Sequence, residues 1–146
     1  MAEFSHVADS LNATDKPLVY TSMSKHLFYF REQISTYVLQ QGAVPLNPFM
    51  VFGYFLNDAV ERDVIRQANN VLVERADQLW HFGPVSDGAL SEILRARDCL
   101  KTVRCFSIVA SRDITEVTFN DVELEPEVSG QRDRLLALTP DEQQRP

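Results

Sequence analysis

The feature that most constrains the fold is a regular alternation of short apolar runs and longer segments of helical spacing. Four runs have the length and β-branched or aromatic content of strands: residues 18–22, 43–46, 78–82 and 103–109. Apolar residues recur at helical spacing in three segments: 27–41, 60–76 and 88–102. In the second segment, a stripe of valines is expected on the core side, with Arg62 and Arg66 on the opposite, solvent side. Alternating strands and helices favour right-handed crossovers and a parallel sheet covered on both faces. We therefore predict a three-layer α/β domain with a mostly parallel sheet of four or five strands, residues 114–119 being the candidate edge strand.

The length and composition predict one compact domain with two polar ends. The chain has 146 residues, of which 45% are hydrophobic, enough for one core. Residues 1–16 lack periodicity and read as a flexible leader, and residues 17–119 form the domain. Residues 120–146 are rich in Asp and Glu and are predicted to be a mobile tail. Within that tail, residues 132–138 could form a short helix.

The charge and the cysteines exclude several classes of protein. A net charge of −7 argues against a surface for a nucleic acid polymer, which needs clustered Lys and Arg. Small anions remain possible ligands, because backbone amides at a helix start can bind them. Cys99 and Cys105 lack metal-ligand spacing, and no signal peptide precedes them, so we predict reduced thiols, a cytoplasmic protein and no metal. The apolar segment 49–56 is too short to span a bilayer, so no membrane partner is expected.

A polar turn that opens the third helical segment is the strongest candidate site. Ser86, Asp87 and Gly88 directly follow the predicted strand 78–82, at the sheet edge where open α/β folds bind ligands. Glu92 lies about a turn and a half into the helix, so its carboxylate could point back toward the strand ends. A carboxylate there can be a nucleophile or a general base. The alternative is an exposed helical Glu beside Arg95.

Other residues at this sheet edge have a ligand-binding and a structural interpretation. The loop that includes Ser22 and Ser24 offers hydroxyls suited to an anion, although polar loops after strands are common. Ser86 is equally well explained as a helix N-cap. Tyr20 could hydrogen-bond at a pocket floor or belong to the core. His81 has apolar neighbours and reads as a core histidine.

Three short patterns resemble the nucleoside 2-deoxyribosyltransferase superfamily, which includes deoxynucleoside 5'-monophosphate N-glycosidases. These are the strand and loop Tyr20-Thr21-Ser22-Met23-Ser24, the pair Ala76-Asp77, and the spacing Ser86-x-Gly88-x-x-x-Glu92. The resemblance covers roughly residues 17–109. It implies a flavodoxin-like sheet, without a metal or redox cofactor.

The resemblance also implies a reaction and roles for single residues. Glu92 would attack the anomeric carbon as the base leaves, and Tyr20 would orient Glu92 or the sugar. Ser24, Ser86 and Gly88 would hold phosphate or sugar oxygens. The sequence departs from the family at two positions. Met23 stands where a glycine is usual, and Asn69 stands where an Asp is usual. Either Asp63 or Asp58 then supplies the proton to the leaving base, or catalysis is weak or absent.

The function expected from this resemblance is cleavage of the N-glycosidic bond of a nucleoside or nucleoside 5'-monophosphate, with hydrolysis favoured over base exchange. Such enzymes act in nucleotide metabolism, and a neighbouring subunit often completes the site, so we expect a homodimer or larger homo-oligomer. The aromatic run 49–55 would then be a base-stacking wall or a dimer face. Two alternatives are a nucleotide sensor without catalysis and an α/β protein-interaction domain.

Overall fold

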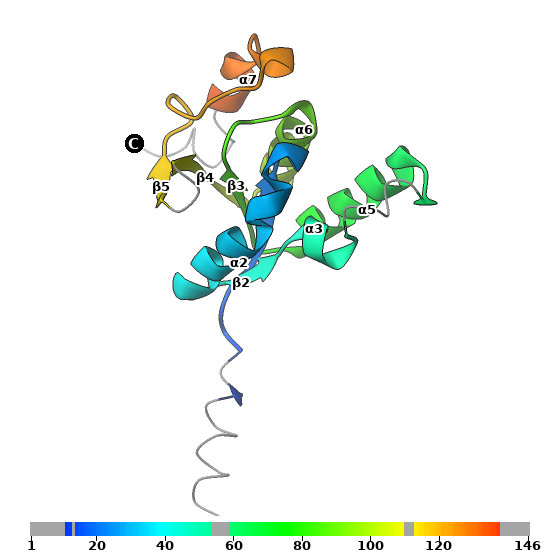
Figure 1. Ribbon diagram of the computed structural model, residues 1–146, viewed down its shortest axis with the longest axis vertical. Helices are drawn as coiled ribbons and strands as arrows, with labels where there is room; N and C mark the ends of the chain where they lie inside the picture. Colours follow the sequence, from blue (N-terminus) through cyan, green and yellow to red (C-terminus); the bar gives the residue numbers. More distant parts are fainter. Residues whose placement is uncertain (1–10, 13, 54–58, 110–112, 138–146) are drawn as a thin grey trace, which may run out of the picture.

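The computed structural model describes residues 11–12, 14–53, 59–109 and 113–137 as an α/β domain (Figure 1). The strands are β1 Leu18–Met23, β2 Val44–Leu46, β3 Gln78–Phe82, β4 Thr102–Val109 and β5 Asp113–Val117. The α-helices are α2 Arg31–Gln40, α3 Pro48–Val51, α5 Arg62–Arg75, α6 Asp87–Asp98 and α7 Arg132–Leu136. Two 3₁₀ helices, η1 Lys25–Phe30 and η2 Pro126–Val128, complete the elements.

The five strands form one sheet in the order β2-β1-β3-β4-β5. The first four strands are parallel, and β5 pairs antiparallel with β4 at the edge. This is the flavodoxin-like order, in which the strand order reverses between β1 and β3. The predicted three-layer, mostly parallel α/β fold is therefore confirmed.

Alternating residues of the strands supply the two halves of the core. On one face, Val19, Trp80 and Phe82 pack with residues of α2. On the other face, Tyr20 and Leu79 pack with α6 and the end of α5. Successive residues of a strand point to opposite faces of the sheet, so residues that are two apart on β1 or on β3 lie on the same face. This alternation decides which side chains of β1 can reach α6.

Helix α5 differs from its predicted packing. Its valine stripe was expected to face the core, yet Val64 and Val71 are about half exposed, at 49% and 51%, and Val73 is the buried residue of the helix. Figure 1 shows α5 projecting away from the rest of the domain, so only its C-terminal part lies against the sheet layer. Helical periodicity detects an apolar face but not how far the underlying sheet extends.

The segment after β5 also differs from the mobile tail that its charge predicted. Val122, Val128 and Leu135 are buried in the same cluster as the α6 core. The backbone of Val85 exchanges two hydrogen bonds of 2.8 Å with Glu123 and Glu125. Residues 120–137 therefore pack on the domain, because a few well-placed apolar side chains outweigh an acidic average. Residues 138–146 and most of the predicted leader lie outside the described residues.

A glycine shapes the chain where it leaves β3. Gly83 has φ of +81°, and a Cβ atom at this position would clash with the side chain of Leu27. Only glycine combines this backbone conformation with such close packing. The turn brings the chain from β3 to the start of α6 at the carboxyl edge of the sheet.

Within the described part of the chain, no helix is long and apolar enough to cross a membrane.

Candidate active site

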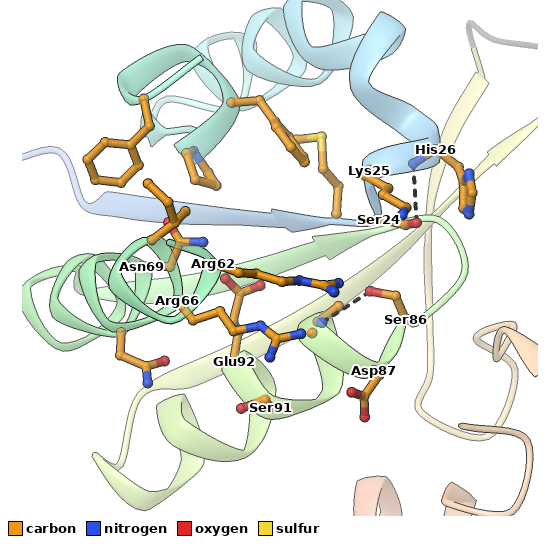
Figure 2. Close-up of a pocket in the computed structure, with 18 of the residues that line it drawn as sticks. Ser24, Lys25, His26, Arg62, Arg66, Asn69, Ser86, Asp87, Ser91 and Glu92 are labelled. Atoms are coloured by element: carbon orange, nitrogen blue, oxygen red, sulfur yellow. Dashed lines mark hydrogen bonds between the residues drawn. The ribbon is translucent and has the colours of Figure 1, made fainter. Parts of the chain in front are cut away.

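A pocket of about 570 Å³ lies at the carboxyl edge of the sheet, near the ends of β1 and β3 (Figure 2). Its walls come from η1, α3, α5 and the start of α6, and the segment after β5 adds Glu125 and Glu127 to its lining. The volume is in the range of small-molecule sites. The pocket lies at the switch point between β1 and β3, where this fold class binds ligands.

Glu92 lines this pocket, and the protein holds both of its carboxylate oxygens. The Tyr20 hydroxyl donates a hydrogen bond to Oε2, and the Ser22 hydroxyl lies 3.2 Å from Oε1. Tyr20 and Ser22 are two residues apart on β1, so the strand directs both toward α6. The alternative interpretation of Glu92 as a solvent-exposed partner of Arg95 is wrong, since Arg95 pairs with Glu74.

Burial raises the pKa of Glu92 from 4.5 to about 7, while the hydrogen bonds from Tyr20 and Ser22 oppose this rise. Burial, reinforced by the adjacent Glu92, holds the pKa of Tyr20 well above its usual value. Tyr20 therefore stays a donor. Glu92 therefore exchanges its proton near neutral pH, which suits acid-base chemistry, and it is ionised and able to act as a nucleophile above that pH.

Ser22 does not lie in a loop as predicted. The strand β1 extends to Met23, and Ser22 is fully buried beneath Glu92 with its hydroxyl between Glu92 and His81. The Ser22 hydroxyl therefore contacts the side chains of Glu92 and His81 and is not part of a ligand-binding loop. The predicted strand 18–22 already ended at Ser22, and its period-two alternation from Tyr20 places Ser22 on the α6 side of the sheet.

The remaining predicted binding residues gather at the mouth of the pocket, as Figure 2 shows. Ser24 caps η1 and accepts a hydrogen bond of 3.3 Å from the amide of His26. Ser86 caps α6 and accepts a 3.1 Å bond from the amide of Ala89. Asp87 and Gly88 follow in the first turn, and the space where a Gly88 side chain would lie is open. The cap interpretation of Ser86 is thus correct, and Ser86 still lines the pocket.

Two basic residues of the pocket were not predicted. Arg62 and Arg66 were assigned to the solvent face of their helix, but both line the pocket. Figure 2 shows them extending from α5 across the opening toward the turn at Ser86. With Lys25 of η1 they place positive charge opposite the start of α6, whose first amides have no helical partner. Their spacing of four residues was a usable signal that both lie on one helix face.

The two positions that depart from the resembling family both line the pocket. Met23 is almost fully buried at the end of β1. Asn69 projects from α5, and its Oδ1 atom is buried without a hydrogen-bond partner among the described residues. Asp63 is exposed and pairs with Arg66 at 3.7 Å. Asp58 lies outside the described residues.

The aromatic run is divided between the pocket and the surface. Phe49 and Phe52 line the pocket, and Phe49 makes an edge contact with Phe28 at 5.7 Å between ring centroids. Met50 and Val51 are half exposed on the outside of α3. Residues 54 and 55 of the run lie outside the described residues.

Comparison with known proteins shows the family to which the chain belongs. A model described as "Domain of unknown function (DUF7768)" matches residues 20–106, more than half of the chain. The chain belongs to the DUF7768 family. The family match begins at Tyr20 and includes α5, β3 and all of α6, so the pocket-lining elements of those segments lie within the DUF7768 domain.

Beyond the DUF7768 match, the comparisons found little. No curated protein matches the chain. Among solved structures, a 2-desoxiribosyltransferase from Leishmania mexicana matches with 13% identity and a TM-score of 0.49. That match covers 77% of this chain and 85% of the other. In the described part of this DUF7768 chain, no group of three or more His, Cys, Asp or Glu side chains is arranged to hold a metal ion.

The raised pKa of Glu92 predicts a stability that falls as pH rises. The unfolded chain ionises near 4.5 and the folded chain near 7, so ionisation opposes folding between these values. The lowered pKa of His81 contributes a change of opposite sign, which is shared by the wild type and by variants of Glu92. We therefore expect the free energy of unfolding of the wild type to fall by as much as about 3 kcal/mol from pH 4.5 to pH 8 relative to that of Glu92→Gln, which stays neutral and keeps both hydrogen-bond partners.

Urea unfolding of both proteins across this pH range measures the difference. Asp98→Asn removes a negative charge from the exposed end of the same helix and should retain the wild-type pH dependence. Parallel curves for the wild type and Glu92→Gln would show that Glu92 has an ordinary pKa.

Proposed function

We propose that this protein cleaves the N-glycosidic bond of a nucleoside or nucleoside 5'-monophosphate, with Glu92 as the nucleophile and water as the usual acceptor. The observation that carries the proposal is the pair of hydroxyls, on Tyr20 and Ser22, that hold Glu92 at the floor of a pocket. The spacing of Ser86, Gly88 and Glu92, which resembles the monophosphate N-glycosidases, supports the substrate class.

The reaction follows from the position of the carboxylate. One oxygen of ionised Glu92 forms a bond to C1' of the sugar as the bond from C1' to the base nitrogen breaks. The departing base keeps the bonding electron pair and takes up a proton from water at the pocket opening. A water molecule then attacks C1' and releases a proton to solvent as the bond from C1' to Glu92 breaks, which gives the free sugar and returns the carboxylate. Tyr20 keeps the carboxylate in place through both steps.

The other lining residues supply binding. Phe49 and Phe52 offer aromatic faces on which a base can stack. Ser24, Ser86 and Gly88 would contact phosphate or sugar oxygens, and Arg62 and Arg66 would neutralise a phosphate. Since a carboxylate repels phosphate, we expect Asp87 to accept hydrogen bonds from sugar hydroxyls.

A nucleotide sensor is the second candidate, and Asn69 is the observation that favours it. An amide cannot protonate a leaving base, and the exposed Asp63 pairs with Arg66 instead of lining the pocket. The Oδ1 atom of Asn69, which has no hydrogen-bond partner in the part of the chain that the structure describes, is suited to accept a hydrogen bond from a bound base. A sensor would therefore keep the whole binding pocket and release no base.

We also propose a cytoplasmic homo-oligomer that acts in nucleotide metabolism. The half-exposed valines of α5, Val64 and Val71, and the exposed Met50 and Val51 of α3 are suited to contacts between subunits. Neither metal nor redox chemistry enters the proposed reaction.

Chromatographic detection of free base from a panel of ribo- and deoxyribonucleosides and their 5'-monophosphates tests the reaction. The wild type should release base from at least one member, faster above pH 7 than below because the nucleophile must be ionised. Glu92→Ala and Glu92→Gln should reduce the rate by at least about 10³-fold, as expected on loss of a nucleophile. Asp98→Asn should retain the wild-type rate.

Base release by Glu92→Ala at the wild-type rate would disprove the mechanism. A thermal-shift measurement tests the sensor. If nucleotides stabilise the wild type and no member of the panel releases base, the result would support the sensor.

The arginines predict a preference for phosphorylated substrates. Arg66→Glu should raise KM for a 5'-monophosphate by about tenfold or more, since a favourable charge pair becomes a repulsive one. The KM for the matching nucleoside should change little. Arg75→Glu makes the same charge change at the other end of α5 and should leave both values near those of the wild type. Equal losses for nucleoside and monophosphate would contradict a phosphate contact at Arg66.

A further inference from the structure

His81 is a fully buried polar residue of β3 that the proposed reaction does not use. Its Nε2 atom lies 2.8 Å from the carbonyl oxygen of Gly83, which can only accept a hydrogen bond. Burial lowers the pKa of His81 to about 4, so the ring is neutral at physiological pH. The single ring proton therefore lies on Nε2, and Nδ1 is an acceptor.

Ser22 connects this acceptor to Glu92. Its Oγ atom lies 3.2 Å from His81 Nδ1 and 3.2 Å from Glu92 Oε1. A serine hydroxyl has one hydrogen, so Ser22 can donate to only one of these two acceptors at a time. An ionised carboxylate is the stronger acceptor and takes the hydrogen. A carboxylate that has lost its charge no longer competes as strongly with the imidazole.

We propose that His81 is a positioning residue that takes over the Ser22 hydrogen bond as Glu92 loses its negative charge. The proposal rests on the proposed function, because bond formation to C1' is one way in which Glu92 loses charge. Protonation of Glu92 is the other way, and the protonated carboxyl group then donates a hydrogen bond from Oε1 to the Ser22 oxygen. In both cases Ser22 turns its hydrogen to His81, and no covalent bond to that hydrogen breaks.

The consequence for catalysis is a differential stabilisation. Without His81, the hydrogen bond from Ser22 would stabilise the ionised nucleophile and weaken as the nucleophile reacts, which raises the barrier. With His81, the hydrogen finds a second acceptor as the carboxylate charge disappears. The buried histidine thereby offsets part of the stabilisation that would otherwise be lost in the transition state.

The groups that face this chain of contacts from neighbouring elements are few. His81 has Ser22 as its register partner on β1 and Cys105 on β4, and burial raises the pKa of the Cys105 thiol to about 12. Among the described residues, the Tyr20 hydroxyl contacts Glu92. The charged and amide groups that line the pocket with Glu92 come from η1, α5, its own helix and the segment after β5: Lys25, Arg62, Arg66, Asn69, Asp87, Glu125 and Glu127. His26 of η1 lies at the far side of the opening, as Figure 2 shows.

Nitrogen-15 NMR of the wild-type protein labelled in histidine tests the proposal without substrate. The Nδ1 resonance of His81 should shift as Glu92 titrates, with a midpoint near pH 7, while Nε2 stays protonated. In Ser22→Ala this shift should disappear. An Nδ1 resonance that stays constant through the Glu92 titration, or a proton found on Nδ1, would overturn the proposal.

A double-mutant cycle gives a second readout. His81→Phe leaves Ser22 with Glu92 as its acceptor, so the pKa of Glu92, measured by carbon-13 NMR of its carboxyl, should fall by about one unit. In the Ser22→Ala background, His81→Phe should not change that pKa. An equal change in both backgrounds would overturn the proposal, because His81 would then act without Ser22. If His81→Phe does not fold, the wild-type and Ser22→Ala titrations decide.

Activity separates this inference from the proposed function. His81→Phe should lower kcat by about tenfold with KM nearly unchanged, and His81→Gln, whose amide oxygen can accept, should restore part of the loss. A wild type that releases no base but shows the coupled NMR titration would refute the proposed reaction and leave the hydrogen-bond switch standing.

Discussion

The burial of one carboxylate against the central sheet is the interaction on which the candidate site depends. Glu92 could be exposed to solvent on a surface helix, but α6 leads it over β1, where two hydroxyls hold its oxygens. Desolvation raises its pKa to about 7, so the fold maintains a carboxylate that is neither fully protonated nor fully ionised at physiological pH. A group held in this state opposes folding above its unfolded pKa, which is typical of functional residues.

The pocket above Glu92 is assembled from elements that are far apart in the chain. The end of β1 and the start of α6 come together because β1 and β3 are adjacent in the sheet. Helix α5 then adds Arg62, Arg66 and Asn69, and the segment after β5 adds two carboxylates at the rim. The opening therefore combines aromatic, basic and acidic groups, a mixture suited to a ligand that has a flat ring, hydroxyls and a negative charge.

Much of the fold could be predicted from the sequence, because the strands are short apolar runs bounded by turn residues. The bounds of β3 were predicted without error, and the candidate edge strand 114–119 corresponds to β5, whose antiparallel direction was not predicted. The packing of α5 was not predictable, since periodicity shows which face is apolar but not where the sheet ends. The folded segment 120–137 was missed because its acidic average concealed Val122, Val128 and Leu135.

The residues of the candidate site were also predictable only in part. Glu92, Tyr20, Ser86 and Gly88 were predicted as site residues from the place of their turn and strand in the topology and from short patterns that resemble a known family. The roles of Ser22 and His81 depend on strand register, which places them side by side although they are 59 residues apart in the chain. Single-sequence patterns contain no information about such pairs. The same limit explains why Arg62 and Arg66 were read as solvent-facing.

We propose that Glu92 forms a covalent bond to a sugar during the reaction, and trapping that bond is the most direct test. The protein is incubated with a nucleotide analogue bearing fluorine at C2', which slows breakdown of the glycosyl ester, and is then acid-quenched and digested for peptide mass spectrometry. We expect one added glycosyl unit on the peptide that contains Glu92, and no such addition in Glu92→Gln. Release of base with no adduct, or with the adduct on another residue, would contradict the proposal.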